Sequence, residues 1–390
     1  MFVTHNYPRW PGDRAGVFVA RIADLARAAG HEIAVVAPHA AGAEPREMTG
    51  DIDVRRFRYA PEQFERIGYQ GDVAKSLAAP AAILAMPFYA LGFRRAVAIA
   101  VGEFRPDVIH AHWWIPGACA AVGQGVPLVV TCHGSDVRLL LGSRILRRAA
   151  RQVLPHAVSI SAVSRVMRDD LAVVVPAVAS RLSVTYLPVD GERFTRQPAA
   201  RRGPPRILYA GNLIAAKGVD LILRAYARLL GLGVECELRL VGDGPGRPVF
   251  ERLAAELGLG HAVVWAGPRP YDEMPGEFAA ATVTVLASRG PRGEGLPMTA
   301  VEALLGGSAV VATPAGGTGE VIQDGITGLL AADGDAADLA RQLGRMLGDP
   351  ALRQSTVVAG RSLVQSLFAP GPAAARFFAL YEAARAGTAR

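Results

Sequence analysis

Cysteine and lysine are both scarce in this chain of 390 residues. The three cysteines, Cys119, Cys132 and Cys236, are far apart in sequence and form no C-x-x-C pair. This pattern excludes a disulfide framework and the common zinc-site spacings, and it is typical of proteins in a reducing compartment. Only two of the 42 basic residues are lysines, Lys75 and Lys217. Among so many arginines, a lysine in a loop marks a candidate site.

Targeting and membrane-spanning patterns are also missing. The sequence does not open with a basic stretch followed by an apolar one, so we expect no signal peptide and predict a cytoplasmic protein. The apolar run 77–93 has 17 residues and contains Pro80 and Pro87. A spanning helix needs about 20 residues and is weakened by internal proline. We therefore expect a buried or interfacial helix pair in this run.

The formal net charge of +7 and the pI of about 9.6 suit anionic partners such as nucleotide diphosphates and acidic lipids. The arginines form no continuous stripe with interleaved aromatic residues, so nucleic acid is not an expected partner. Basic residues flank the apolar run, at Arg55, Arg56 and Arg58 before it and at Arg94 and Arg95 after it. They indicate peripheral contact with an anionic membrane, while the alternative is that the run packs into the core.

Short β-branched runs alternate with amphipathic stretches along the whole chain, which is typical of parallel sheets with crossover helices. We predict strands at 2–4, 32–37, 52–57, 107–111, 127–132 and 157–162, and then at 206–210, 236–241, 262–266, 282–286 and 309–312. The length suits two domains. They are predicted at 1–190 and 205–365, with a Gly- and Pro-containing linker over 191–204 and a C-terminal helix within 366–390.

The most specific local pattern is SRGPRGEGLPMTAVEALLGG. Glu294 and Glu302 are separated by seven residues, and Pro297 is placed to be the first residue of a helix. Backbone N–H groups near Gly295 and Leu296 would then be available to an anion, with a carboxylate on either side. Such an arrangement suits a ligand with phosphates in its middle and hydroxyls at both ends. The alternative is a pair of solvated glutamates around an ordinary helix.

A second pattern, ILYAGNLIAAKGVD, runs from a strand through Gly211 toward a helix that begins near Lys217. A cation at a helix start is a common phosphate site, although an ordinary surface lysine gives the same pattern. Glycines after a further strand, from Gly242 to Gly246, resemble a dinucleotide fingerprint. Arg247 occupies the third glycine position of that fingerprint and no acidic residue ends the following strand, which argues against a nicotinamide dehydrogenase.

Taken in order, GNLIAAKG, VGDGP, GEGLPMTAVEALLGG and PAGGTGEVIQDGITGLL resemble the C-terminal half of glycosyltransferase family 4. The first half is similar to the same family in YPRWPGDRAGVFVARI, PDVIHAHWWIPG, TCHGSD, SAVSRVM and LPVDGERF. The resemblance implies a GT-B fold: two Rossmann-like domains face each other across a cleft, and the C-terminal helix crosses back to the first, acceptor-side domain. It also implies a retaining enzyme that moves a hexose-type sugar from a nucleotide-diphospho-sugar to a hydroxyl acceptor.

The resemblance assigns roles to single residues. Glu302 would hold the ribose, Glu294 the sugar hydroxyls and Lys217 the diphosphate, and His112 would touch the transferred sugar. His112, Glu294 and Lys217 are thus the expected catalytic residues. His110 is expected to point to the opposite face of its strand, with a core role. His133 and Asp136 would line the acceptor side. The remaining donor contacts would come from Gly16, Gly211, Asn212, Gly242, Gly267, Gly295, Leu296 and Pro297.

One departure from the family concerns the phosphate cations. Many members carry an arginine directly after the glycine of the first C-terminal loop, whereas this chain has Asn212. Arg14, Arg289 or Arg292 could supply the second cation, or helix dipoles could carry more of the charge. No metal-ligand constellation is visible, so no cofactor or metal is expected. A non-catalytic nucleotide-sugar-binding subunit and another GT-B enzyme, a phosphorylase or an epimerase, remain as alternatives.

Overall fold

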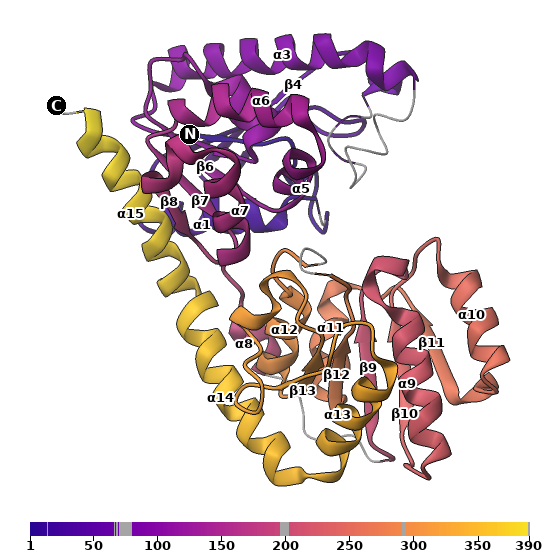
Figure 1. Ribbon diagram of the computed structural model, residues 1–390. Coiled ribbons are helices and arrows are strands. Elements are labelled where there is room, and N and C mark those ends of the chain that lie inside the picture. The colour runs from indigo at the N-terminus through magenta and orange to yellow at the C-terminus, as the bar shows by residue number, and fades with distance from the viewer. Residues whose placement is uncertain are drawn as a thin grey trace. The chain divides into compact units, whose positions relative to one another are not determined.

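The structure is a computed structural model that describes residues 1–13, 15–65, 67, 69, 80–195, 203–290 and 294–388. The chain forms two compact units (Figure 1). Unit 1 comprises Met1–Pro188 and Pro370–Arg390, and unit 2 comprises Val189–Ala369. The chain thus returns to unit 1 at its C-terminus. Each unit is built around its own sheet.

Among its described residues, unit 1 has an eight-stranded sheet in the order β3-β4-β2-β1-β5-β6-β7-β8. All neighbouring strands are parallel except β3, which pairs antiparallel with β4 at one edge. The strands are β1 (Phe2–Val3), β2 (Ile33–Pro38), β3 (Arg46–Thr49), β4 (Ile52–Phe57), β5 (Ile109–His112), β6 (Leu128–Cys132), β7 (Ser159–Ala162) and β8 (Leu182–Val184).

Helices cover both faces of this sheet, as buried parallel strands require. One face packs against α1 (Val17–Ala28) and α15 (Pro370–Thr388), where Ile22 and Phe377 are fully buried. The other face packs against the remaining helices of unit 1, which we call the outer helical layer. These helices are α3 (Pro80–Phe104), α4 (Cys119–Ala121), α5 (Ser135–Gly142), α6 (Arg144–Val153) and α7 (Arg165–Val174).

Helix α3 corrects the expectation of a helix pair in the apolar run. It continues through Pro87 without a break. Pro87 lacks an N–H to donate, but it lies on the exposed side of the helix, where the carbonyl that it leaves free can be hydrated. The first residues of the predicted run, 77–79, lie outside the described residues.

The described part of unit 2 has a six-stranded parallel sheet in the order β11-β10-β9-β12-β13-β14. Its strands are β9 (Arg206–Ala210), β10 (Glu237–Val241), β11 (Val263–Gly267), β12 (Val283–Leu286), β13 (Ala309–Ala312) and β14 (Leu329–Leu330). Its helices are α8 (Gly191–Thr195), α9 (Val219–Gly231), α10 (Arg247–Glu256), α11 (Met274–Ala279), α12 (Met298–Gly306), α13 (Ala336–Gly348) and α14 (Pro350–Phe368). This doubly wound arrangement reverses direction between β9 and β12.

Each predicted strand overlaps an observed one, and three further strands were missed. Strands β3, β8 and β14 have only two to four residues, and β3 carries three exposed side chains, so none gives an apolar run. The predicted linker contains helix α8. This helix forms because Phe194 is fully buried and contacts Phe278. Residues 196–202 of that linker lie outside the described residues.

Loops at the carboxyl ends of the unit 2 strands pack backbone against backbone, and glycine permits this. A Cβ atom at Gly218 would overlap the carbonyl oxygen of Ala287, and one at Gly242 would overlap that of Gly211. Both glycines also have positive φ angles, 65° and 131°. Side chains are disfavoured there on two counts, namely backbone conformation and space.

Substitution Gly218→Ala should therefore destabilise the protein beyond the usual cost of a positive φ angle. Gly233 is a matched control, because it has a φ of 75° but nothing within 4 Å of a Cβ atom. We expect Gly218→Ala to lower the free energy of unfolding by about 1–3 kcal/mol more than Gly233→Ala, the usual cost of overpacking. Urea denaturation of both variants measures the difference. Equal losses would mean that the loop after β12 yields to the added methyl group.

Candidate active site

In unit 2, the candidate residues gather where the sheet reverses direction. The loop after β9 carries Gly211, Asn212 and Lys217, and the loop after β12 carries Glu294. Strands β9 and β12 are paired neighbours, with Val283 opposite Ile207. Their following loops therefore leave the same edge and diverge toward opposite faces of the sheet. Ligands of doubly wound sheets bind at this topological switch point.

Lys217 and Glu294 form an ion pair across this switch point. The same carboxylate oxygen, Oε1, accepts a hydrogen bond of 2.5 Å from the Ser288 hydroxyl. The Lys217 side chain is 27% exposed and that of Glu294 is 13% exposed, so both remain within reach of a ligand. Ser288 follows β12 by two residues, and no sequence pattern distinguishes it from other loop serines.

Glu302 lies inside helix α12 and is half-buried. Its Oε1 accepts a hydrogen bond of 3.0 Å from the Tyr271 hydroxyl. Tyr271 follows β11 and lies under the Arg193 guanidinium, at 5.0 Å from the ring centre. Arg193 is in turn paired with Asp272. Tyr271 was missed by the sequence analysis, because its loop contains no motif.

The start of α12 leaves backbone donors near both glutamates. Helix α12 begins at Met298, and Pro297 is the N-cap residue rather than the first helical residue. No side chain caps this helix start. The preceding turn contains Gly295 and Leu296, both half-buried. Uncapped N–H groups and the helix dipole favour an anion at such a position.

The second phosphate cation is not provided by Arg289 in this structure. Its Nη2 donates a 2.5 Å hydrogen bond to Asp220, and its Nη1 contacts the carbonyl of Ala215. The other two candidates, Arg14 and Arg292, lie outside the described residues. Asn212 itself is exposed. Its carbonyl oxygen, and not its side chain, accepts the hydrogen bond of the Tyr209 hydroxyl.

The other glycines of the predicted donor set mainly determine the backbone conformation and hydrogen bonding of the loops in which they lie. The Gly211 N–H donates to the carbonyl of Val241, and the Gly242 N–H donates to that of Gly267. Gly267 has a φ of 70° and open space around a Cβ position. In unit 1, Gly16 caps the start of α1 with a φ of 64°, and a Cβ atom there would overlap the backbone of Asn6. Glycine is thus required at 16 to fold the loop after β1.

Unit 1 brings four histidines together around β1 and β5, where its own sheet reverses direction. His112 Nδ1 lies 3.0 Å from His133 Nε2, and the His110 ring lies 4.1 Å from that of His112. The expectation that His110 points to the opposite face was wrong, because residues two apart in a strand share a face. His110 does have a core role, with hydrogen bonds of 2.8 Å to Tyr381 and to Thr131.

Several polar atoms in this cluster have no partner within the described structure. They are His5 Nδ1, Asn6 Oδ1, His112 Nε2 and His133 Nδ1. Trp113, which packs against His5 and His133, has a φ of 65° although it is not glycine. Unpaired buried polar atoms and a strained backbone are both costly and cluster at functional sites. Together they indicate a ligand-binding position.

The two histidines of the motifs differ in accessibility. His112 is fully buried, whereas His133 is half-buried and contacts Phe18 and Trp113 at the rim of the cluster. Asp136 is 1% exposed. Its carboxylate accepts hydrogen bonds from the backbone N–H groups of His133, Gly134, Val137 and Trp114. Asp136 therefore fixes the loop that carries His133, and it presents no free oxygen toward an acceptor.

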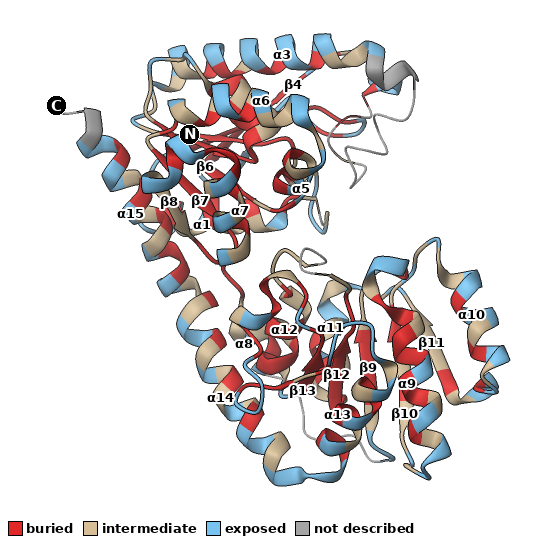
Figure 2. Cartoon of the chain, viewed as in Figure 1, coloured by how far each residue is buried: buried red, intermediate tan, exposed pale blue. Residues whose placement is uncertain are grey.

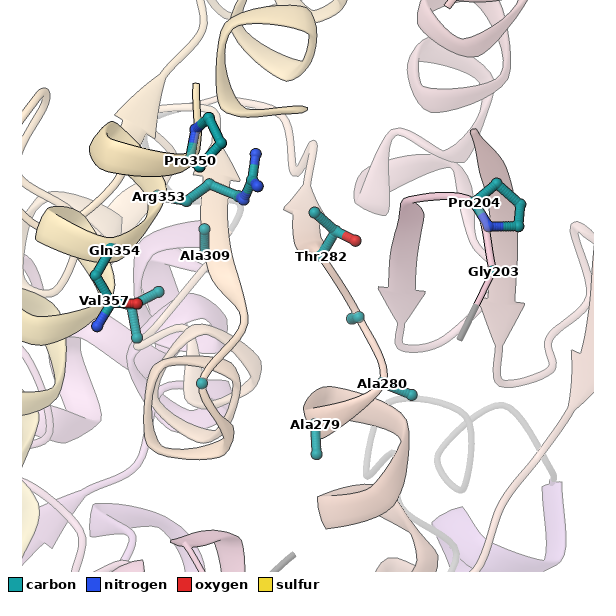
Figure 3. Close-up of a pocket in the computed structure, with 12 residues that line it drawn as sticks. Gly203, Pro204, Ala279, Ala280, Thr282, Ala309, Pro350, Arg353, Gln354 and Val357 are labelled. Atoms are coloured by element: carbon teal, nitrogen blue, oxygen red, sulfur yellow. The ribbon is translucent and has the colours of Figure 1, made fainter. Parts of the chain in front are cut away.

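A separate hollow of about 470 Å³ lies at the opposite edge of the unit 2 sheet. It is lined by residues at the amino ends of the strands and at the start of α14, including Thr282, Ala309 and Pro350 (Figure 3). None of the candidate residues borders it. Within the described ranges, no group of three or more His, Cys, Asp or Glu side chains could hold a metal ion.

Acidification should destabilise unit 1 through its histidines. Burial lowers the pKa of His5 from 6.5 to about 4. Between these two pH values the His5 side chain is protonated in the unfolded chain but not in the folded one. Stability then falls as pH drops from about 6.5 toward 4, at up to about 1.4 kcal/mol per pH unit for this group. The variant His5→Gln should show a shallower fall between pH 7 and 5 in urea denaturation. Tryptophan fluorescence reports mainly on unit 1, which holds Trp10, Trp113 and Trp114 of the four tryptophans.

The matched control is His156→Gln, because His156 is exposed. Its pH dependence should equal that of the unmodified protein. If the free energy of unfolding changes with pH equally in His5→Gln and His156→Gln, the buried histidine cluster does not set the pH dependence of stability.

Comparison with known proteins places both units. A model of glycosyl transferases group 1 matches residues 190–363, and a model of glycosyltransferase family 4 matches residues 15–193. A D-inositol 3-phosphate glycosyltransferase from Catenulispora acidiphila is 31% identical over 309 residues, which cover 72% of this chain and 73% of the relative. A GDP-mannose-dependent phosphatidylinositol monomannoside mannosyltransferase from Mycolicibacterium smegmatis is 28% identical over 387 residues, covering 93% of this chain and 92% of the relative.

The fold has solved counterparts as well. The structure of Anabaena HepE in complex with UDP and glucose superposes with a TM-score of 0.71 at 19% identity, covering 98% of each chain. At this level of identity the likeness shows a shared fold, and it extends over both units of the chain. With its two units matched by these two models, the chain belongs to the family 4 and group 1 glycosyltransferases of the GT-B fold.

Proposed function

We propose that this glycosyltransferase transfers a hexose-type sugar from a nucleotide-diphospho-sugar to a hydroxyl acceptor, with retention of the anomeric configuration. The observation that carries the proposal is the set of paired groups at the unit 2 switch point. Lys217 with Glu294 and Tyr271 with Glu302 flank the uncapped start of α12. A cation, free backbone donors and two separate carboxylates match a molecule with a central diphosphate and hydroxyls at both ends.

In this proposal, Glu302 accepts hydrogen bonds from the vicinal ribose hydroxyls, and Tyr271 orients its carboxylate. Glu294 accepts from hydroxyls of the sugar. Lys217 turns from Glu294 toward the diphosphate, which carries more charge than one carboxylate. Backbone groups from Gly295 to Met298 complete the phosphate site. No metal is required in this scheme, since protein groups meet the charge of the leaving diphosphate.

The chemical step exchanges one bond for another at the anomeric carbon. The acceptor oxygen bonds to that carbon on the face from which the diphosphate leaves, and the bond between the carbon and the phosphate oxygen breaks. The leaving phosphate oxygen takes the proton of the acceptor hydroxyl. Lys217 and the start of α12 stabilise the negative charge that develops on the diphosphate.

Unit 1 has a candidate ligand contact of its own. We assign it to His133 rather than to His112, because His133 is half-buried whereas His112 is fully buried. His112 then positions the His133 ring, and Asp136 positions its backbone. The His5 ring contacts Trp113, and its Nδ1 atom, which has no partner within the described structure, could meet a hydroxyl group of a ligand.

Names of similar proteins leave the donor base open. The mycobacterial relative is named for GDP-mannose, whereas the Anabaena structure contains UDP and glucose. A thermal-shift screen against UDP, GDP and ADP sugars identifies the base, because a ligand that binds only the folded state raises the melting temperature. Incubation of the preferred sugar with candidate acceptors, followed by NMR of the product anomer, tests transfer and retention. Binding without transfer or hydrolysis would indicate a non-catalytic subunit instead.

Loss of single donor contacts should be measurable in turnover. We expect Glu302→Gln and Lys217→Ala each to lower kcat/KM by about tenfold or more, since one charged hydrogen bond contributes about 1.5–3 kcal/mol. Tyr271→Phe should give a smaller loss, about three- to tenfold, because it removes a group that orients the Glu302 carboxylate and leaves that carboxylate in place. Arg224→Gln, on the exposed side of α9, is the control. Near-normal activity of both charged-site variants would remove this donor site.

A second cation at position 212 should strengthen diphosphate binding. Asn212 is exposed at the switch point, and Arg289 is already paired with Asp220. We therefore expect Asn212→Arg to lower the Kd of the nucleoside diphosphate severalfold, as measured by calorimetry at 50 mM salt, with a smaller gain at 500 mM. An unchanged Kd would mean that another arginine already provides the second cation.

A further inference from the structure

The outer side of α3 is apolar and exposed. Tyr89, Phe93, Val97 and Ala100 of this helix pack onto the unit 1 core and are at most 1% exposed. On the opposite side, large apolar side chains recur at helical spacing and face solvent: Leu84 at 75%, Phe88 at 66%, Leu91 at 69% and Ile99 at 50% exposure. Figure 2 shows this outer side of α3 in pale blue. Contiguous apolar surface of this kind marks an interaction site.

The segment Leu84–Phe104 is long and apolar enough to cross a membrane by length and composition alone. It also contacts strands β2 and β4 along its inner side. A helix that covers a sheet cannot at the same time be surrounded by lipid. Any contact of α3 with a bilayer would therefore be parallel to the bilayer surface, as in interfacial helices.

Helix α6 supplies positive charge. Arg147 and Arg148 each lie three or four residues from Arg144 and Arg151, so the four arginines share one side of the helix, and they line a hollow of about 370 Å³. Arg147 and Arg151 donate to backbone carbonyls, of Leu141 and Val174. Arg144 and Arg148 are exposed and form no ion pair within the described part of the chain. Beside them, Ile145 is 80% exposed.

The two surfaces point in the same direction. Ala150 of α6 and Phe93 of α3 are buried in the same core, on the same face of the unit 1 sheet. Both helices belong to the outer helical layer, so their exposed sides both face away from that sheet. Arg95 is exposed on α3 between Leu91 and Ile99 and adds to the charge. Helix α6 has no acidic residue, and Glu103 of α3 is paired with Arg55 at 2.8 Å.

The basic cluster expected at 55–58 does not contribute. Arg55 is paired with Asp53 and Glu103, and Arg58 lies 3.6 Å from both Glu62 and Glu65. Arg56 is 4% exposed and paired with Glu47. The structure thus pairs the arginines that precede the apolar run with carboxylates, leaves Arg95 after the run exposed, and adds positive charge on α6.

We propose that the outer helical layer of unit 1 docks onto an anionic lipid bilayer. Leu84, Phe88, Leu91 and Ile99 enter the interface between head groups and acyl chains, while Arg95 and the arginines of α6 contact lipid phosphates. The apolar row and the arginines are both needed to identify an anionic bilayer as the partner. A nucleic acid would use the arginines but leave the apolar row in water. This inference is independent of the donor and acceptor.

Co-sedimentation with vesicles tests the proposal. The full chain should bind vesicles of phosphatidylcholine with 30% phosphatidylglycerol at 50 mM salt, bind pure phosphatidylcholine weakly, and be released at 500 mM salt, where charges are screened. The double variant Arg144→Gln, Arg148→Gln should lose roughly ten- to thirtyfold in partition constant, the value of two basic residues near a charged surface. Its control is Arg224→Gln, Arg228→Gln, which removes two exposed arginines at the same spacing from α9 of unit 2.

The apolar row has its own test. The double variant Phe88→Ser, Leu91→Ser should weaken vesicle binding at least tenfold, while Leu232→Ser, Val249→Ser, at exposed positions of unit 2, should not. In the Phe88→Trp variant, the fluorescence emission of the introduced indole should move to shorter wavelength on vesicle binding, because the indole leaves water. Melting temperatures of all surface variants should match that of the unmodified protein, which excludes misfolding as the cause.

Three results would overturn the proposal. The first is absence of binding to phosphatidylglycerol vesicles at 50 mM salt. The second is equal vesicle binding by the α6 and α9 arginine variants. The third is binding that depends on the arginines but not on Phe88 and Leu91, together with competition by DNA, which would identify α6 as a general polyanion surface.

Discussion

The reversal of strand order inside each parallel sheet is the constraint on which the rest of the structure depends. Because neighbouring strands are parallel, their following loops all leave at one edge, and only at the reversal do two adjacent loops diverge and leave room between them. In unit 2 this point lies between β9 and β12, and in unit 1 between β1 and β5. Lys217 and Glu294 flank the first, and the histidine cluster flanks the second. Glycines 16, 218 and 242 are required because the loops there touch through their backbones.

The two switch points prepare their polar groups in different ways. In unit 2 the polar groups already have partners within the protein: Lys217 is paired with Glu294, and the Tyr271 hydroxyl donates a hydrogen bond to Glu302. A ligand there would exchange existing partners, which keeps the side chains in place at little cost. In unit 1, one ring nitrogen of His112 and one of His133 have no partner among the described residues, and Trp113 holds a strained backbone conformation. Such groups gain more from a bound hydroxyl, since an unpaired buried polar atom costs about 1–3 kcal/mol.

The helices on the two faces of the unit 1 sheet have different roles. One face is closed by α1 and by α15, whose Phe377 is fully buried and whose Tyr381 hydroxyl binds His110. The C-terminal helix therefore supports the histidine cluster from behind. The other face carries α3 and α6, whose outward sides combine exposed apolar groups and unpaired arginines. This is the surface that we propose to contact lipid.

The sequence by itself determined the alternation of strands and helices, the two-domain organisation and the pair of glutamates, Glu294 before α12 and Glu302 within it. These follow from local patterns: β-branched runs, glycine and proline punctuation, and a seven-residue spacing. Only the tertiary structure decided which groups meet. Ser288 and Tyr271 became part of the site because strands distant in sequence end at the same edge. The charges of Arg55 and Arg56 are paired with Asp53, Glu103 and Glu47, and that of Arg58 with Glu62 and Glu65, whereas Arg144 and Arg148 of α6 form no ion pair within the described residues. Ion pairing and burial depend on neighbours that the chain brings together only when it folds, and so no local pattern could reveal them.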